Sequence, residues 1–326
     1  MKRLAPSINA VLLALLALFA LSVGATHIDN FWNVLFNPGS NEILWQIRLP
    51  RVFAAILVGA ALGIAGLMAQ GACNNALAEP AILGTSAGAS FGAVVGILFG
   101  LVQVGSLGAI LCGAIGALLA TSLTFRLASL RNNLSSFALV IVGIAVSASI
   151  SAVVGLATSM VTRADARSIS FWSFGSLSLI TAENLFGLAL IIIIGALIAW
   201  KVAPSLDLLS LGEFTAFHLG VNIKQTRILA LISLSILAGG AVSTVGTIAF
   251  LGLAAPHIAR FIYGPAYRFL VIQSALIGAT VLLLADTAAR TIALPNELPI
   301  GLVTSIIGAP ILIALVVMKN TTWRTP

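Results

Sequence analysis

The sequence predicts an all-α integral membrane protein with about ten membrane-spanning helices. Hydrophobic residues make up 60% of the 326 residues and charged residues only 8%. Soluble domains contain about 45–50% apolar residues and about 25% charged residues. Apolar runs recur along the chain near the roughly 20 residues that a helix needs to cross the hydrocarbon core. No polar connection between them is long enough for a soluble domain. We therefore expect one transmembrane domain over residues 1–326, and exclude a disordered chain and a nucleic-acid binder.

The ten apolar runs give the expected order of helices. The first follows Lys2 and Arg3 and is too long for the apolar region of a signal peptide, so we expect it to be the first span. The eighth is short and contains Pro256. The expected spans lie near residues 8–25, 52–72, 82–101, 105–125, 136–158, 186–203, 228–247, 248–263, 270–290 and 299–318.

The distribution of basic residues predicts the orientation. Ten spans place both termini on one side, and eleven Lys and Arg residues then fall in cytoplasmic segments against five outside, as the positive-inside rule requires. The cytoplasmic residues are Lys2, Arg3, Arg126, Arg131, Lys201, Lys224, Arg227, Arg260, Arg268, Lys319 and Arg324, and the external residues are Arg48, Arg51, Arg163, Arg167 and Arg290. We expect both termini in the cytoplasm.

Glycines recur at every fourth position along the third expected span. Residues four apart share a helix face, so this face has no side chains and a neighbouring backbone can approach it closely. Gly59 and Gly63 form a shorter version in the preceding span. Two interpretations stay open: helix packing alone, or a compact core around a transport pathway. The glycines are Gly84, Gly88, Gly92, Gly96 and Gly100.

Two prolines mark expected breaks at membrane depth. Pro80 ends a polar connection, and Pro256 interrupts the eighth span beside His257. The breaks fall at corresponding places in the halves 52–158 and 228–318, and such weak internal duplication is common in transporters.

The sequence has no residues for an enzyme. All four lysines lack a preceding glycine, so there is no phosphate-binding loop, and there is no HExxH motif, carboxylate pair or acidic cluster. The three histidines, His27, His218 and His257, are far apart in sequence. We expect no catalytic site and no metal site.

The longest cytoplasmic connection, with its core at residues 204–224, contains a short helix signal. Ser210 and Glu213 have the spacing of a capping box, and Gly220 supplies a stop. The expected helix covers Leu211–Leu219, about nine residues, which is too short to span.

This short helix exposes aromatic side chains. Phe214, Phe217 and His218 lie near one another, and exposed apolar groups in a cytoplasmic loop need a surface to cover them. The helix either lies on the membrane or fits a groove on a soluble partner.

Ordered fragments from about residue 45 to 318 resemble the iron-siderophore, haem and cobalamin permeases of bacterial ATP-binding-cassette (ABC) importers. In the first half they are Arg48-Leu49-Pro50-Arg51, Gln70-Gly71, Asn75 to Pro80, Leu83-Gly84 and Ser86 to Ala89. In the second half they are Leu211-Gly212-Glu213, Leu219-Gly220-Val221, Gly246 to Arg260, Ala285-Asp286 with Arg290, Glu297 to Gly301 and Gly308-Ala309-Pro310.

The resemblance implies the partners. A second copy or a close homologue completes the pathway, two cytoplasmic ATPases hold ATP and Mg, and an extracytoplasmic substrate-binding protein delivers a ferric siderophore or related metal chelate. The chain itself binds no cofactor and works by alternating access in the cytoplasmic membrane of a bacterium, in contact with lipid.

The resemblance also implies three sets of site residues. The ATPases grip Ser210, Leu211, Gly212, Glu213, Phe214, Phe217, His218, Leu219 and Gly220. The binding protein docks at Arg48, Arg51 and Arg290. The pathway or its gate lies at Gln70, Asn74, Asn75, Leu77, Ser86, Pro256 and His257. Near this last set the sequence departs from the family pattern, with Asn74-Asn75-Ala76 where the family has Arg-Asn-Pro, so the chelate stays open.

The charged residues leave alternatives open. Asp286 lies four residues before Arg290 and can orient it for docking, or the two form an ion pair that neutralises costly charges, each about 2.5–3.5 kcal/mol at mid-depth. Arg48 and Arg51 either dock the binding protein or anchor to lipid headgroups. A rival function is a proton-coupled secondary transporter that uses Asp286, Glu79 or His257 as proton carriers.

Overall fold

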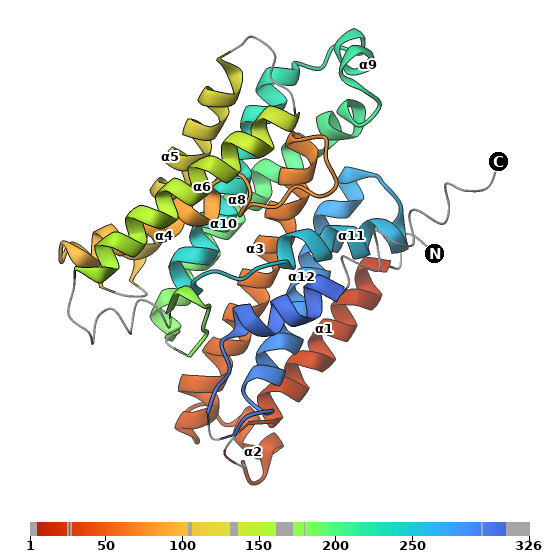
Figure 1. Ribbon diagram of the computed structural model, residues 1–326. Coiled ribbons are helices and arrows are strands. Elements are labelled where there is room, and N and C mark those ends of the chain that lie inside the picture. Colours follow the sequence, from red (N-terminus) through yellow and green to blue (C-terminus); the bar gives the residue numbers. More distant parts are fainter. Residues whose placement is uncertain are drawn as a thin grey trace.

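Every regular element in the described part of the chain is helical, which confirms the all-α class (Figure 1). The computed structural model describes residues 5–24, 26, 28–103, 106–130, 136–160, 172–178, 180–294 and 296–310. Several residues on which the expected orientation depends lie outside these ranges, as do both ends of the chain. They are Lys2, Arg3, Arg131, Arg163, Arg167, Lys319 and Arg324.

Each of the ten predicted apolar segments contains a helix. In order these are α1 (Ala5–Ser22), α3 (Leu49–Ala72) with the preceding π-helical turn η1 (Ile43–Arg48), α4 (Thr85–Leu98), α5 (Leu107–Ser129), α6 (Ser136–Ser159), α8 (Ala182–Leu209), α10 (Ile223–Val245), α11 (Leu251–Tyr263), α12 (Tyr267–Ala289) and a final helix, Ile300–Pro310. Two short helices, α2 (Phe31–Phe36) and α9 (Glu213–His218), lie at opposite ends of the molecule (Figure 1).

Six of the described helices are long and apolar enough to cross a bilayer: η1 with α3, α5, α6, α8, α10 and α12. The others are shorter, with 14 residues in α4 and 13 in α11. The order of ten apolar helices is confirmed, and the number that crosses the whole bilayer stays a prediction.

Helices α3 and α10 form the centre of the bundle, and most of their residues are buried. α3 packs against α12 through the short glycine pair, because a Cβ on Gly59 would lie 2.5 Å from the carbonyl oxygen of Gly278. Helix α10 packs against α5 in the same way at Gly239. Small residues therefore allow the backbones to approach closely where lipid offers no hydrophobic driving force.

The glycine repeat forms the interface between α4 and α5. A Cβ on Gly88 would lie 2.5 Å from the carbonyl oxygen of Gly116, and Gly92 faces the Cys112 carbonyl even more closely. Gly96 meets Val102 and Cys112. The packing interpretation is confirmed for these three glycines. The end members, Gly84 and Gly100, have φ of 84° and 66° and form turns instead.

We expect Gly92→Val to lower the free energy of unfolding by about 1–3 kcal/mol or more, because the new side chain overlaps the α5 backbone. Thermal unfolding in detergent measures the change. The matched control is Gly155→Val in α6, where nothing lies within 4 Å of the added Cβ. Equal shifts in the two variants would show that α4 and α5 do not depend on this close contact.

The internal duplication is visible in the backbone. α3 and α10 are each followed by a non-helical segment, then by a short helix, α4 or α11, whose N-cap residue has left-handed backbone: Gly84 with φ 84° and Phe250 with φ 63°. Pro80 of the first segment packs against Gly252 in the first turn of α11.

The prediction that Pro256 breaks the eighth span is wrong. Pro256 lies at the sixth position of α11, and the break is at residues 246–250. The break occurs there because Gly246, with φ 79°, turns the chain directly against the carbonyl oxygen of Trp172, where a Cβ has no room.

Candidate functional site

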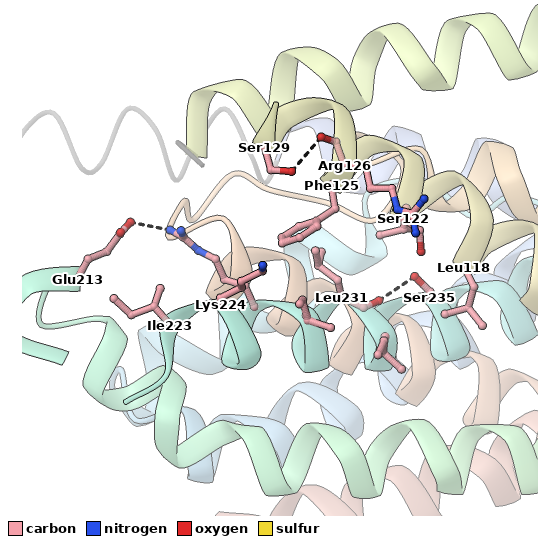
Figure 2. A pocket seen from close by; sticks show the side chains of 14 residues that line it. Leu118, Ser122, Phe125, Arg126, Ser129, Glu213, Ile223, Lys224, Leu231 and Ser235 are labelled. Carbon is pink, nitrogen blue, oxygen red and sulfur yellow. Dashed lines mark hydrogen bonds and ion pairs between the residues drawn. The ribbon is translucent and has the colours of Figure 1, made fainter. Parts of the chain in front are cut away.

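Helix α9 is held by an ion pair at the end of the molecule that is expected to face the cytoplasm. Arg227 of α10 donates from Nη2 to Glu213 Oε1 at 2.7 Å and from Nε to the carbonyl oxygen of Ala72 at 3.1 Å (Figure 2). Arg227 is buried, whereas Glu213 is half exposed. The short helix is thereby attached to the N-terminal end of α10 and the C-terminal end of α3, which are the two central helices of the bundle.

The predicted capping box is wrong. Helix α8 continues to Leu209, so Ser210 is its C-cap, and the Ser210 hydroxyl donates to the carbonyl oxygen of Asp207 at 2.6 Å. Gly212, with φ 107°, is the N-cap of α9 and Glu213 its first residue. Glu213 turns to Arg227 and not back to Ser210 because a buried guanidinium is the stronger partner. The helix is consequently six residues long and not nine.

The predicted stop at Gly220 is confirmed. Gly220 has φ 83° and donates to the carbonyl oxygen of Phe217 at 3.0 Å, while the amide of Val221 donates to Ala216 at 3.0 Å. This pair of bonds is a Schellman motif, which satisfies the last carbonyls of a helix.

Gly220→Ala is expected to loosen α9, because an alanine in left-handed backbone costs about 1–2 kcal/mol. Amide hydrogen exchange over residues 213–221 should become about fivefold faster. Gly39→Ala is the control, since Gly39 also has a φ of 80° but lies beside α2 at the other end. Unchanged exchange over 213–221 in Gly220→Ala would contradict the assigned role of the Schellman glycine.

The surface of α9 is aromatic and uncovered. Phe214 is 79% exposed and Phe217 is 68% exposed, and the neighbouring Leu211 and Leu219 are also exposed. The His218 ring lies 4.4 Å from the Phe214 ring in an edge-to-face arrangement. The residues predicted for ATPase docking therefore form one raised apolar surface, which we call the α9 knob (Leu211, Phe214, Phe217, His218 and Leu219).

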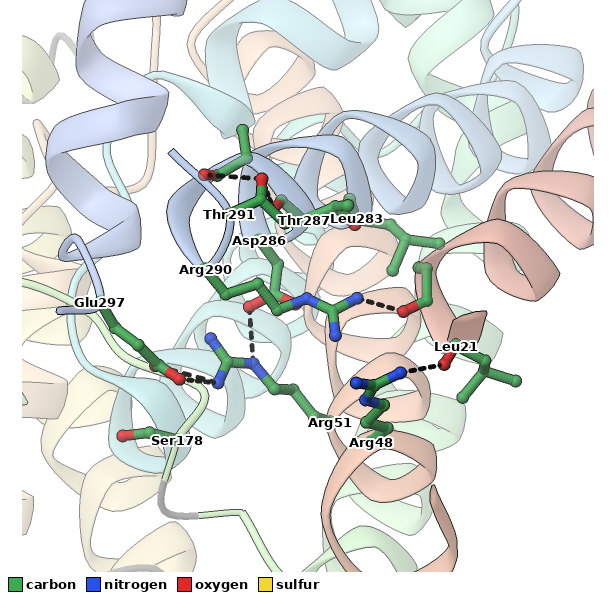
Figure 3. Close-up of polar contacts among 12 residues, drawn as sticks. Leu21, Arg48, Arg51, Ser178, Leu283, Asp286, Thr287, Arg290, Thr291 and Glu297 are labelled. Carbon is green, nitrogen blue, oxygen red and sulfur yellow. Dashed lines mark hydrogen bonds and ion pairs between the residues drawn. The ribbon is translucent and has the colours of Figure 1, made fainter. Parts of the chain in front are cut away.

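At the outer end, Arg51 of α3 is the centre of a buried ion cluster (Figure 3). Its Nε donates to Asp286 Oδ1 of α12 at 2.9 Å, and its Nη1 lies 2.8 and 2.9 Å from the two carboxylate oxygens of Glu297. The side chain of Asp286 is 0% exposed, whereas that of Glu297 is 41% exposed. One guanidinium thus connects two helices and the connection before the last helix.

The other two predicted docking arginines belong to the same cluster. Arg290 lies 3.5 Å from Asp286 Oδ2, which confirms the expected i,i+4 pair, and it donates to the carbonyl oxygen of Ala20. Arg48 donates to the carbonyl oxygen of Leu21 at 2.8 Å. Both guanidiniums satisfy carbonyls at the C-terminal end of α1, where cations are stabilised.

The structure brings Arg48, Arg51 and Arg290 together but buries all three. They form no open basic surface, and each has partners within the chain. The geometry favours the ion-pair interpretation of Asp286 and Arg290. Lipid headgroup anchoring does not describe Arg48 or Arg51, because their guanidiniums point into the protein (Figure 3). Their role in docking a binding protein stays a prediction.

The predicted pathway residues fall into two groups. Gln70 of α3 lies 3.4 Å from His257 Nδ1 of α11 and accepts from Arg260 at 3.0 Å, so this pair meets beside Pro256. The remaining ones, Asn74, Asn75 and Leu77, lie in the turn segment after α3, with Ser86 in the first turn of α4. Within that segment the backbone amide of Leu77 donates to Asn75 Oδ1 at 2.9 Å. Their role in transport stays a prediction.

Known proteins that are similar to this chain include permeases of several transport systems. The chain is 36% identical over 316 residues to the hemin transport system permease protein of Yersinia pestis, covering 95% of this chain and 94% of that protein. It is 36% identical over 309 residues to an iron(3+)-hydroxamate import system permease protein of Bacillus subtilis, covering 92% and 79%. It is 34% identical over 315 residues to the vitamin B12 import system permease protein of Vibrio parahaemolyticus, covering 96% and 93%.

The fold has a solved counterpart. A protein described as a metal-chelate type ABC transporter, in an inward-facing conformation, superposes with a TM-score of 0.84 at 30% identity, covering 97% of this chain and 99% of that chain. The FecCD transport family matches residues 10–318. The chain therefore belongs to the FecCD transport family and is a multi-pass membrane permease of an ABC importer, not an enzyme.

Proposed function

We propose that this permease carries a ferric siderophore or related metal chelate, that two cytoplasmic ATPase subunits grip the α9 knob, and that closure of the ATPases moves α9. The observation that carries the proposal is that Phe214 and Phe217 are exposed on α9. Among the described residues, the one ion pair of this helix joins Glu213 to Arg227 of α10. A force applied at α9 would reach the centre of the bundle through Glu213 and Arg227, and through Arg227 the end of α3.

Alternating access follows from the same geometry. A ligand or a partner shifts the equilibrium between inward-open and outward-open states only by binding them differently. The break of α3 follows the end of that helix beside α9, and the break of α10 follows its opposite end. A shift of the two central helices as rigid bodies would therefore move both breaks. Pairing with a second copy or a close homologue, which would complete the pathway, is part of the proposal.

The substrate class comes from the relatives. Their names specify hemin, ferric hydroxamates and vitamin B12, all of which are large metal chelates. Apart from Leu77 and Pro256, the candidate pathway residues are Gln, Asn, Ser and His, which offer hydrogen bonds and no carboxylate or guanidinium for charge selection. The binding protein would therefore set most of the selectivity.

Docking of that binding protein at the outer end is also proposed. The half-exposed Glu297 is the accessible carboxylate of the arginine cluster. An acidic residue of the binding protein would compete with Glu297 for Arg51, and Arg48 and Arg290 would hold the surrounding helices in place.

Asp286 is not favoured as a proton carrier for the rival function, proton-coupled secondary transport. Asp286 is fully buried between two guanidiniums, where water does not reach it. A proton carrier has to exchange protons with both sides of the membrane in turn, and this carboxylate instead completes a structural ion pair.

The substrate is tested with the reconstituted transporter and its cognate binding protein. Loading the binding protein with ferric hydroxamate, haem or cobalamin should stimulate ATP hydrolysis strongly for one of the three chelates. Stimulation by the unloaded binding protein alone, or by none of the three, would overturn the chelate assignment.

A further inference from the structure

A cavity of about 1150 Å³ lies between α5 and α10 at the end of the molecule that carries α9 (Figure 2). It exceeds the roughly 300–1,000 Å³ of ordinary small-molecule sites. Its walls combine apolar side chains, principally Leu118, Phe125, Ile228, Leu231 and Ile232, with hydroxyl and charged side chains. None of these residues belongs to the candidate pathway or to the arginine cluster.

The cavity lies beyond the part of α5 and α10 where small residues bring the two backbones together. A Cβ on Gly239 of α10 would lie 2.8 Å from the Cα of Ala114 of α5, so the two backbones are close there. α5 and α8 meet at their outer ends, where Leu107 packs on Gly187. Toward the inner side, longer side chains line the space between α5 and α10, and the cavity fills it.

The length of the cavity matches one leaflet of a bilayer. Its lining runs from Leu118 to Ser129 on α5 and from Ile223 to Ser235 on α10. Eleven residues of helix at 1.5 Å each extend about 17 Å. The hydrocarbon core is about 30 Å thick, so the cavity spans about half of it, from the inner surface toward the middle.

The inner rim of the cavity is basic. Arg126 and Lys224 are exposed there, and neither has an acidic partner within the part of the chain that the structure describes. The third basic residue, Arg227, is paired with Glu213, which is the single acidic residue of the lining. Two positive charges are therefore available to a ligand at the level of the lipid headgroups.

We propose that this cavity binds one anionic phospholipid of the inner leaflet. The headgroup phosphate would bind Arg126 and Lys224, and an acyl chain would lie along the apolar walls. Basic sites between membrane helices on the cytoplasmic side recognise anionic headgroups in this way. A free phosphate ion would use the rim alone and leave some 17 Å of apolar wall uncovered.

The test uses the purified full-length chain and two lipids with identical acyl chains, phosphatidylglycerol and phosphatidylcholine. Native mass spectrometry should show preferential retention of phosphatidylglycerol. The double variant Arg126→Gln/Lys224→Gln should lower this retention about 10- to 30-fold while leaving phosphatidylcholine unchanged. The matched control is Lys201→Gln/Arg268→Gln, which removes the same charge from the same side of the membrane away from the cavity.

A second measurement tests the acyl chain. Phe125→Trp places a fluorescent indole in the cavity, and phosphatidylglycerol brominated on its chains should quench this added fluorescence more than brominated phosphatidylcholine does. Equal loss of phosphatidylglycerol in the two double variants would reduce the effect to surface charge and overturn the proposal. The proposal would also be overturned if the double variant Arg126→Gln/Lys224→Gln no longer bound the ATPase subunit but retained phosphatidylglycerol as before. That result would assign the basic rim to binding of the ATPase.

Discussion

Asp286→Ala is expected to lower the free energy of unfolding of this permease by about 3–5 kcal/mol, because it leaves buried guanidiniums without their shared carboxylate. Arg51 would retain only Glu297, and Arg290 would retain the carbonyl of Ala20. Both cations lie where water cannot compensate. We expect a sharply reduced yield of folded protein and a large drop in the midpoint of thermal unfolding in detergent.

The matched control is Glu297→Ala. Both carboxylates bind the same guanidinium at similar distances, but Glu297 is half exposed and an exposed ion pair contributes only about 0–1 kcal/mol. Asp286→Ala should therefore destabilise the protein several times more than Glu297→Ala. Similar effects from the two variants would mean that burial does not determine the strength of the cluster.

The double variant Phe214→Ala/Phe217→Ala is expected to weaken binding of the ATPase subunits at least about 100-fold, because exposed aromatic side chains at the centre of an interface carry most of its binding energy. The stability of the isolated permease should not change, since neither ring is buried within the chain. Co-purification and titration of the ATPase with detergent-solubilised permease measure the affinity.

Phe186→Ala is the control for this variant. Phe186 of α8 has the same 79% exposure as Phe214 but lies outside the α9 knob. It should leave ATPase binding intact. Normal binding by the α9 double variant would place the α9 knob on the membrane surface, the other interpretation that the sequence allows, and would remove the basis for coupling through α9.

Features set by short-range periodicity could be predicted from the sequence. The order of the helices follows from the length of the apolar runs, and the α4–α5 contact follows from glycines four residues apart. The stop at Gly220 follows from the left-handed backbone that glycine favours. In each case the determining residues lie within a few turns of one another.

Features set by contacts between residues far apart in the sequence could not be predicted from it. Arg51 and Glu297 are 246 positions apart. Arg48 and Arg290 bind backbone carbonyl groups of α1. Every residue type carries a backbone carbonyl, so no side chain in the sequence identifies these partners. Serine is favoured at the N-cap position of helices, yet Ser210 ends α8, because α8 continues past Pro204. A serine between two helices fits either end, and only the packing decides.

The central claim is that this chain is a passive gate driven from α9. The most direct test is chelate uptake by vesicles that contain the permease, its ATPase subunits and its binding protein. We predict uptake that requires ATP hydrolysis on the side of α9, continues when a protonophore collapses the proton gradient, and stops when the ATPase phosphate loop is disabled. Uphill uptake by the permease alone on a proton gradient would contradict the account.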